Sequence, residues 1–144
     1  MTHADAGHYK KKHPEGTPLS PEIADPLRQK TRDGCVTCAQ AHDIAKTGKK
    51  PPRDVGMSMD LMELRLTACQ LGLFGYGPKQ KKVSPAATVS ADLADAIEKK
   101  TRSGRISCES TWDIAEQLGI PKMAVAAACE TLKFKISPCQ LGAF

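Results

Sequence analysis

Residues 111–134 read TWDIAEQLGIPKMAVAAACETLKF, and their pattern predicts two helices joined by a tight turn. Gly119 and Pro121 mark the turn, because glycine readily ends one helix and proline fits the first turn of the next. Apolar side chains then recur at helical spacing, for example at Val125 and Ala128. The stretch therefore indicates a helix pair with one face turned towards a core.

The wider chain contains this plan twice, because residues 21–74 align without a gap on residues 91–144. Identical residues at this offset include Cys38 and Cys108, and the tetrapeptide Cys-Gln-Leu-Gly at residues 69–72 and 139–142. A gapless internal repeat indicates one folding unit used twice. Each copy is small for independent stability, so we expect the two copies to pack on each other or to dimerise.

Each copy predicts the order helix, strand, helix, helix, strand, which makes the fold class mainly α with a small β component. In the second copy we expect helices over residues 91–104, 111–119 and 121–134, and short strands over residues 105–107 and 134–137. In the first copy we expect a methionine-rich third helix from about Arg53 to Leu66. The predicted domains are a flexible N-terminal arm (1–20), a first unit (21–75), a basic linker (76–90) and a second unit (91–144).

Residues 114–132 resemble a helix-turn-helix, with Ala115 where two helices pack closely, Gly119 at the turn and Val125 ten residues after Ala115. With a strand on either side, the unit resembles the winged-helix-like DNA-binding superfamily, although no single family within it is indicated. The resemblance implies a nucleic-acid-binding, regulatory protein whose third helix enters the major groove.

The first copy matches the pattern at Ala45 and Val55, but Lys49 stands at the turn where glycine is expected. In neither copy does the outer face of the third helix carry the usual set of base-reading Arg, Asn and Gln side chains. Two functions therefore stay open. One is nucleic-acid binding through mostly electrostatic contacts, and the other is a non-catalytic adaptor for a protein partner.

Cations near the ends of the first helices and in the linker are the candidates for phosphate contacts. The net charge is +5, and much of the surplus lies in the linker. The candidate nucleic-acid-binding residues are Lys30, Arg32, Lys79, Lys81, Lys82, Lys99, Lys100, Arg102, Arg105 and Lys122. The alternative is that these cations are solvated side chains that favour helix C-termini.

The cysteines raise the possibility of a metal site. Cys38 and Cys69 recur as Cys108 and Cys139, and each pair is expected to be close within its unit, either as buried thiols or beside a site. The first copy adds two further potential ligands, so that a zinc or iron–sulfur site in this copy would use Cys35, Cys38, His42 and Cys69. A redox dithiol at Cys35 and Cys38 is the other alternative.

The remaining expectations concern partners and location. No run of residues is apolar enough to span a bilayer or to act as a signal core, so we expect a cytoplasmic protein with reduced cysteines. No catalytic motif stands out, so we expect no enzyme activity. Met57, Leu61 and Leu64 form a second apolar stripe on the third helix of the first copy, which predicts a protein partner, the other repeat or a second chain.

Overall fold

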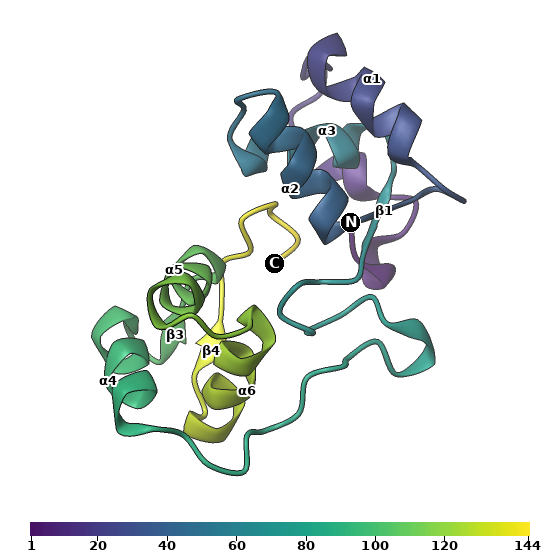
Figure 1. Ribbon diagram of the computed structural model, residues 1–144. Helices are drawn as coiled ribbons and strands as arrows, with labels where there is room; N and C mark the ends of the chain where they lie inside the picture. Colours follow the sequence, from purple (N-terminus) through teal and green to yellow (C-terminus); the bar gives the residue numbers. More distant parts are fainter.

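The computed structural model describes the backbone of residues 1–144 and every side chain except those of His3 and Lys79. It consists of two three-helix units stacked end to end (Figure 1). The first unit contains α1 (Pro21–Lys30), β1 (Cys35–Thr37), α2 (Cys38–Thr47), α3 (Pro52–Leu61) and β2 (Arg65–Thr67). The second contains α4 (Ala91–Lys100), β3 (Arg105–Ile106), α5 (Cys108–Leu118), α6 (Lys122–Leu132) and β4 (Lys135–Ile136). The predicted fold class, mainly α with a small β component, is confirmed.

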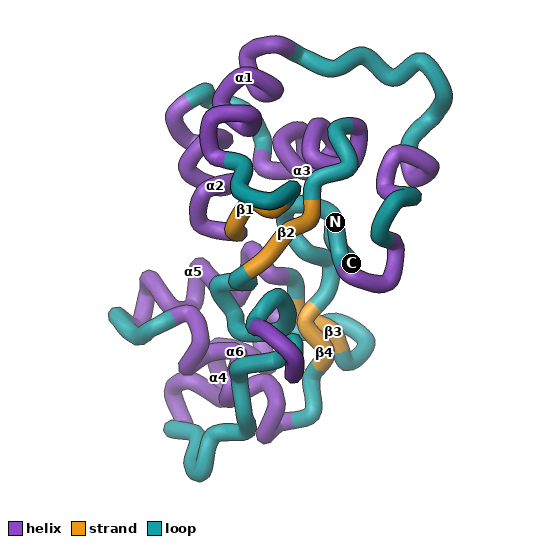
Figure 2. Tube along the Cα trace, turned by 90° about the vertical axis from the view of Figure 1, so that its right-hand side faces the viewer, coloured by secondary structure: helices purple, strands orange, loops and turns teal.

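Each unit has a two-stranded parallel sheet, with the helix pair as the connection between the strands. Cys35 pairs with Arg65 in the first unit, and Arg105 pairs with Lys135 at the equivalent register of the second. Parallel strands need a crossover of this kind, whereas a wing would be an antiparallel hairpin. The short strands hold the ends of the helix pair together, close to the junction between the units (Figure 2).

The turn between the second and third helices has the same geometry in both units. Gly119 has a left-handed backbone with φ of 64°, and Lys49, at the equivalent position, has φ of 53°. In both turns the next N–H bonds to the alanine carbonyl five residues earlier, at 2.9 Å in the first unit and 3.0 Å in the second. Lys49 therefore accepts a conformation that is normally left to glycine.

The third helix of the first unit is shorter than the sequence predicts. It ends at Leu61 rather than near Leu66, because Glu63 turns left-handed with φ of 54° and the Leu64 N–H bonds back to the Met59 carbonyl at 2.9 Å. The following residues form β2. Leu64 thus lies beyond the helix and is buried in the core of the first unit, so it is not part of a helical stripe.

Residues 1–20 pack against α3, where the sequence led us to expect a flexible arm. They form two short 3₁₀ turns, η1 (His3–Asp5) and η2 (Tyr9–Lys12), and Tyr9 is buried. The buried carboxylate of Asp60 on α3 accepts contacts from Lys12 Nζ at 3.0 Å and His13 Nε2 at 2.7 Å. A buried carboxylate needs such partners, and the arm supplies them.

The linker between the units also follows the protein surface. After η3 (Gly77–Lys79), Val83 is buried in the core of the second unit, and the Ala86 N–H donates to the Ala127 carbonyl of α6 at 3.1 Å. Lys81 Nζ lies 2.6 Å from Glu130 Oε1, also on α6. The linker therefore covers much of the outer side of α6.

The two units exchange short segments. Leu71, which follows β2 of the first unit, is fully buried in the core of the second unit. Its equivalent Leu141 is buried in the core of the first unit. The backbone of Leu141 approaches α3 so closely that a Cβ atom on Gly56 would lie 1.7 Å from the Leu141 carbonyl oxygen. This reciprocal exchange joins the units, as Figure 1 shows for the C-terminal segment that reaches towards α2.

Candidate cysteine centre

Two cysteines begin equivalent helices: Cys38 is the first residue of α2 and Cys108 is the first residue of α5. The residues before them, Thr37 and Ser107, are the N-caps. Each cap oxygen accepts a hydrogen bond from the backbone N–H three residues later, at 3.2 Å and 3.0 Å respectively. The caps fix the helix starts, so both thiols sit on a first turn, where the helix dipole favours negative charge.

Two further cysteines, Cys69 and Cys139, lie in equivalent turns after β2 and β4. In each turn the cysteine carbonyl accepts the N–H of the glycine three residues later, at 2.9 Å in the first unit and 3.1 Å in the second. The cysteine N–H donates to the carbonyl of the phenylalanine five residues later, at 3.2 Å and 2.9 Å. The shared tetrapeptide therefore folds in the same way in both units.

Residues that contact their own equivalents mark an approximate two-fold axis between the units. The rings of His42 and Trp112, which are equivalent in the repeat, have centroids 4.3 Å apart. The rings of Phe74 and Phe144, also equivalent, meet edge to face at 5.8 Å. A residue can touch its own equivalent only near such an axis, so the axis passes through both aromatic pairs.

The cysteines of both units gather beside this axis. Cys38 and Cys108 lie one helical turn before His42 and Trp112. The Cys108 N–H donates to the Pro138 carbonyl at 3.0 Å, and Gln140 Nε2 donates to Cys108 Sγ at 3.4 Å, so Cys139 is held next to Cys108.

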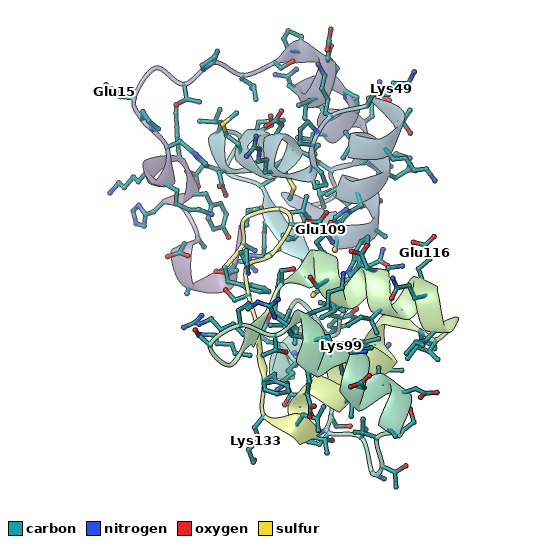
Figure 3. The ribbon with its side chains drawn as sticks, turned by 90° about the vertical axis from the view of Figure 1, so that its left-hand side faces the viewer. Glu15, Lys49, Lys99, Glu109, Glu116 and Lys133 are labelled. Carbon is teal, nitrogen blue, oxygen red and sulfur yellow. The ribbon has the colours of Figure 1, made fainter. Side chains whose placement is uncertain are left out.

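The exchanged segments bring the units' cysteines together across the junction. Cys69 belongs to the same buried cluster as Cys108, while Cys139 packs against the cluster that contains Cys38. Figure 3 labels Glu109, the neighbour of Cys108, at this junction. We call Cys38, Cys69, Cys108 and Cys139 the cysteine centre. The expectation that each duplicated pair is close is thus met, and the two pairs are close to each other as well.

Burial disfavours the charged form of three thiols of the cysteine centre, those of Cys38, Cys69 and Cys108. Burial, followed by the charges that Cys69, Cys139 and Cys108 would carry, raises the pKa of Cys38 to about 12. Burial likewise raises the pKa of Cys108 to about 11 and also raises the pKa of Cys69. Neutral, buried thiols are poor nucleophiles, so this arrangement does not favour a redox dithiol.

The ligand set predicted within the first unit is not assembled. Cys35 lies in β1 and lines a surface cavity together with Arg65 and Phe74, while the His42 ring stacks on Trp112. Burial, and next Lys122, lower the pKa of His42 to about 4. Of the predicted ligands, Cys38 and Cys69 alone join the centre, because Cys35 faces a surface cavity and His42 is held against Trp112. Among the described side chains, no three of His, Cys, Asp and Glu are grouped closely enough to hold a metal ion.

The sequence reasoning missed Cys108 and Cys139 as partners of the first unit's cysteines. The signal was present, since both pairs occupy identical repeat positions. The predicted metal site was nevertheless confined to the first copy, because Cys35-x-x-Cys38 provides the familiar local spacing for such a site. Side chains brought together from two copies can be recognised only once the packing of the copies is known.

The cations predicted to contact phosphate are spread over the molecule rather than gathered in one patch. Lys30 and Arg32 follow α1, and Lys99, Lys100, Arg102 and Arg105 are near the end of α4. These two helices lie at opposite ends of the molecule (Figure 1).

Several of the same cations already have partners. Lys99 pairs with Asp95 at 2.9 Å, and the ammonium of Lys122 lies 4.6 Å from the Trp112 ring centroid. In the linker, Lys81 pairs with α6 and the ammonium of Lys82 lies 5.3 Å from the Tyr76 ring centroid. The side chain of Lys79 falls outside the described part of the structure.

The third helices are covered on their outer sides. The arm packs on α3, and the linker crosses α6. Base readout in the major groove requires an exposed helix face. Nucleic-acid binding through these helices therefore gains no support from the geometry and stays a prediction.

The apolar stripe predicted to meet a partner has a partner within the chain. Met57 and Leu61 are half-buried on α3, and Leu61 lines a cavity with Lys10 and His13 of the arm. Leu64 is buried in the first unit's core, as described above. The arm thus covers part of the surface that the sequence assigned to another molecule.

In the part of the chain that the structure describes, no helix combines the length and apolar character that crossing a membrane requires. Comparison with protein-family models, curated proteins and solved structures gives no significant match for this chain.

Proposed function

We propose that this chain is a small, non-catalytic binding protein whose two units together hold a metal ion at the cysteine centre once the thiols draw together, since no three of the described ligand side chains are grouped closely enough in the present structure. The observation that supports the proposal is the convergence of four cysteines from equivalent repeat positions beside one axis. Thiolate sulfur is the protein ligand that thiophilic metals prefer. Each unit supplies half of the ligands, so neither unit can complete the site alone.

The surroundings of the sulfur atoms support binding over simple core packing. A buried thiol that only fills space needs no hydrogen-bond donors, yet Gln140 Nε2 points at Cys108 Sγ from 3.4 Å. Donors of this kind are the usual outer shell of metal-bound thiolates.

Metal analysis of the full chain, purified without air, tests the proposal. We expect close to stoichiometric zinc or iron in the wild type and its loss in the double variant Cys38→Ser/Cys108→Ser. The matched control is Cys35→Ser/Cys129→Ala, which removes two cysteines outside the centre and should keep the metal. A metal-free wild type after loading with zinc or iron, or equal metal in both double variants, would contradict the proposal.

A further inference from the structure

We propose that a cavity beside β4 binds an extended peptide segment of another protein, one that carries a methionine or a similar unbranched apolar side chain. The inference is independent of the cysteine centre. It rests on the internal repeat, because the place equivalent to this cavity in the first unit is filled by the chain's own Met1.

Met1 shows how such a segment is held. It is only 1% exposed and belongs to the same buried cluster as Met59, Leu64 and Leu66. The Leu66 N–H donates to the Met1 carbonyl at 2.8 Å, so the backbone of the arm adds to the outer edge of β2. Figure 2 places the N-terminus beside this sheet. The place in the first unit therefore accepts one carbonyl group and one apolar side chain.

The equivalent place in the second unit is an open cavity of about 360 Å³, near the lower end of the range for ligand sites. It is lined by the residues equivalent to the neighbours of Met1, namely Cys129, Phe134 and Ile136. Phe74 and Phe144 also line it and meet edge to face at 5.8 Å, so all three phenylalanines of the chain surround this cavity. An apolar surface that the arm fills in one unit is thus left open in the other.

The backbone of β4 offers the same hydrogen bond as β2. The N–H groups of Lys135 and Ser137 both donate to the β3 side of the sheet, at 3.0 Å and 2.8 Å. Because successive N–H groups of a strand point to opposite edges, the Ile136 N–H points away from β3. Ile136 is equivalent to Leu66, and outside the sheet no residue in the described part of the chain accepts its N–H. A peptide carbonyl can accept it, which is the main-chain contact of strand addition.

The charges at the two places differ. In the first unit the Met1 amino group lies 3.5 Å from Oδ1 of Asp60. The equivalent carboxylate in the second unit, that of Glu130, already pairs with Lys81 Nζ at 2.6 Å. The cavity therefore needs no ammonium group from its ligand, and an internal segment of a polypeptide suits it as well as an amino terminus does.

The arm of a second copy does not suit this cavity, because each arm is held on its own unit. Tyr9 is buried, and the N–H groups of Tyr9 and Lys10 donate to the Glu63 carboxylate at 3.2 Å and 2.9 Å. Release of Met1 would open the core of the first unit and remove a partner from the buried Asp60 carboxylate. We therefore assign the cavity to a segment of a different protein.

The test titrates the ¹⁵N-labelled full chain with the synthetic peptide acetyl-Ser-Thr-Met-Thr-Ser-amide and follows the backbone amides by NMR. The acetyl group leaves the peptide without an ammonium group for Asp60. We expect saturable binding with a Kd of about 1 mM or tighter and a downfield shift of the Ile136 amide proton, as a new hydrogen bond requires. The same peptide with serine in place of methionine should bind about tenfold more weakly, because it has no apolar side chain to bury.

Two matched variants locate the site. Phe144 and Leu118 are large apolar residues of similar exposure, 42% and 40%, and Phe144 lines the cavity whereas Leu118 lies on α5 away from it. Phe144→Glu should weaken peptide binding about tenfold, because burial of a charge beside the ligand is costly. Leu118→Glu should stay within about twofold of the wild type. Circular dichroism shows that each variant is folded, and the serine peptide tests the wild type alone.

The remaining outcomes overturn the inference. If the peptide shifts the Leu66 amide instead of the Ile136 amide, it displaces the arm from the first unit and the β4 cavity is not its site. If the Ile136 signal moves with protein concentration and not with peptide, the occupant is a second copy. If no signal moves at about 10 mM peptide, ten times the expected Kd, the cavity binds no such segment. These measurements do not depend on metal content, so their failure leaves the proposed function untouched.

Discussion

Replacing Gly56 with alanine should loosen the junction between the two units. In the present structure the added Cβ atom would lie 1.7 Å from the Leu141 carbonyl oxygen and 2.6 Å from its carbonyl carbon. Since Cβ atoms essentially never come within 3.0 Å of such atoms, the Leu141 backbone would have to retreat by about 1.3 Å or more. The retreat withdraws a leucine that is only 1% exposed from the core of the first unit.

The size of the effect follows from two opposing contributions. Alanine favours a helix over glycine by about 1 kcal/mol, which stabilises α3. Complete loss of a buried leucine side chain costs about 2–5 kcal/mol. A partial withdrawal of Leu141 therefore leaves a net loss of about 1–3 kcal/mol in the free energy of unfolding.

Urea denaturation of the full chain measures this loss. The matched control is Gly48→Ala, because Gly48 has an ordinary φ of −83° and its added Cβ would meet the Ile44 carbonyl oxygen at 3.2 Å, a contact that a small shift relieves. We expect that control to stay within about 0.5 kcal/mol of the wild type. A Gly56→Ala variant as stable as the wild type would refute the close packing of α3 on the exchanged segment.

Three further predictions concern single residues. Lys49→Gly should stabilise the chain by about 0.5–1 kcal/mol in urea denaturation, because Lys49 has a left-handed φ of 53°. Gly119→Ala should destabilise the chain by about 1 kcal/mol for the same reason, and the opposite signs would contradict the shared turn geometry. Asp60→Asn should cost about 1–3 kcal/mol and speed tryptic cleavage in the arm, because the carboxylate pairs with Lys12 and His13; unchanged cleavage would argue against a docked arm. The lowered pKa of His42, about 4 against 6.5 in the unfolded chain, means that protons bind the unfolded state more readily, so stability is full above pH 6.5 and falls as the pH drops towards 4. The loss of unfolding free energy between pH 7 and pH 4.5, measured by thermal melts, should be smaller in His42→Phe by about 1–2 kcal/mol after allowance for solvent screening. The same dependence of stability on pH in both proteins would count against burial of the ring.

Much of the fold follows from local signals in the sequence. The turn at Gly119 and Pro121 and the apolar stripes are short-range features, so they fix the order of the elements in each unit. The start of α5 was placed too late, at residue 111, because the helix is capped by Ser107 and begins at Cys108. The end of α3 was misplaced because Glu63 carries no glycine-like signal and yet turns left-handed. The arm was misjudged because its docking depends on Asp60, which lies far away in the sequence.

The candidate site required information that a single copy does not contain. Within the first copy, Cys35 lies closest to Cys38 in sequence, and local spacing favours that pair. In the structure the exchange of Leu71 and Leu141 decides which thiols meet, because it carries Cys69 and Cys139 across the junction. The repeat shows which cysteines are equivalent, but the symmetry between the copies appears only when the copies pack.

Differences between the two copies become informative once the axis is located. His42 and Trp112 contact each other, which shows that a pair meeting on the axis can consist of two unlike rings. Gly56 and its equivalent Ala126 also differ, and at Gly56 the exchanged backbone of Leu141 leaves no room for a Cβ atom. The cysteines of the centre and the tetrapeptide that carries two of them are instead identical in both copies. Packing also keeps equivalent residues identical, as Leu71 and Leu141 show, because each enters the core of the other unit. A shared core and the proposed shared ligand both account for the identity of the four thiols, and the metal analysis of the Cys38→Ser/Cys108→Ser variant separates the two explanations.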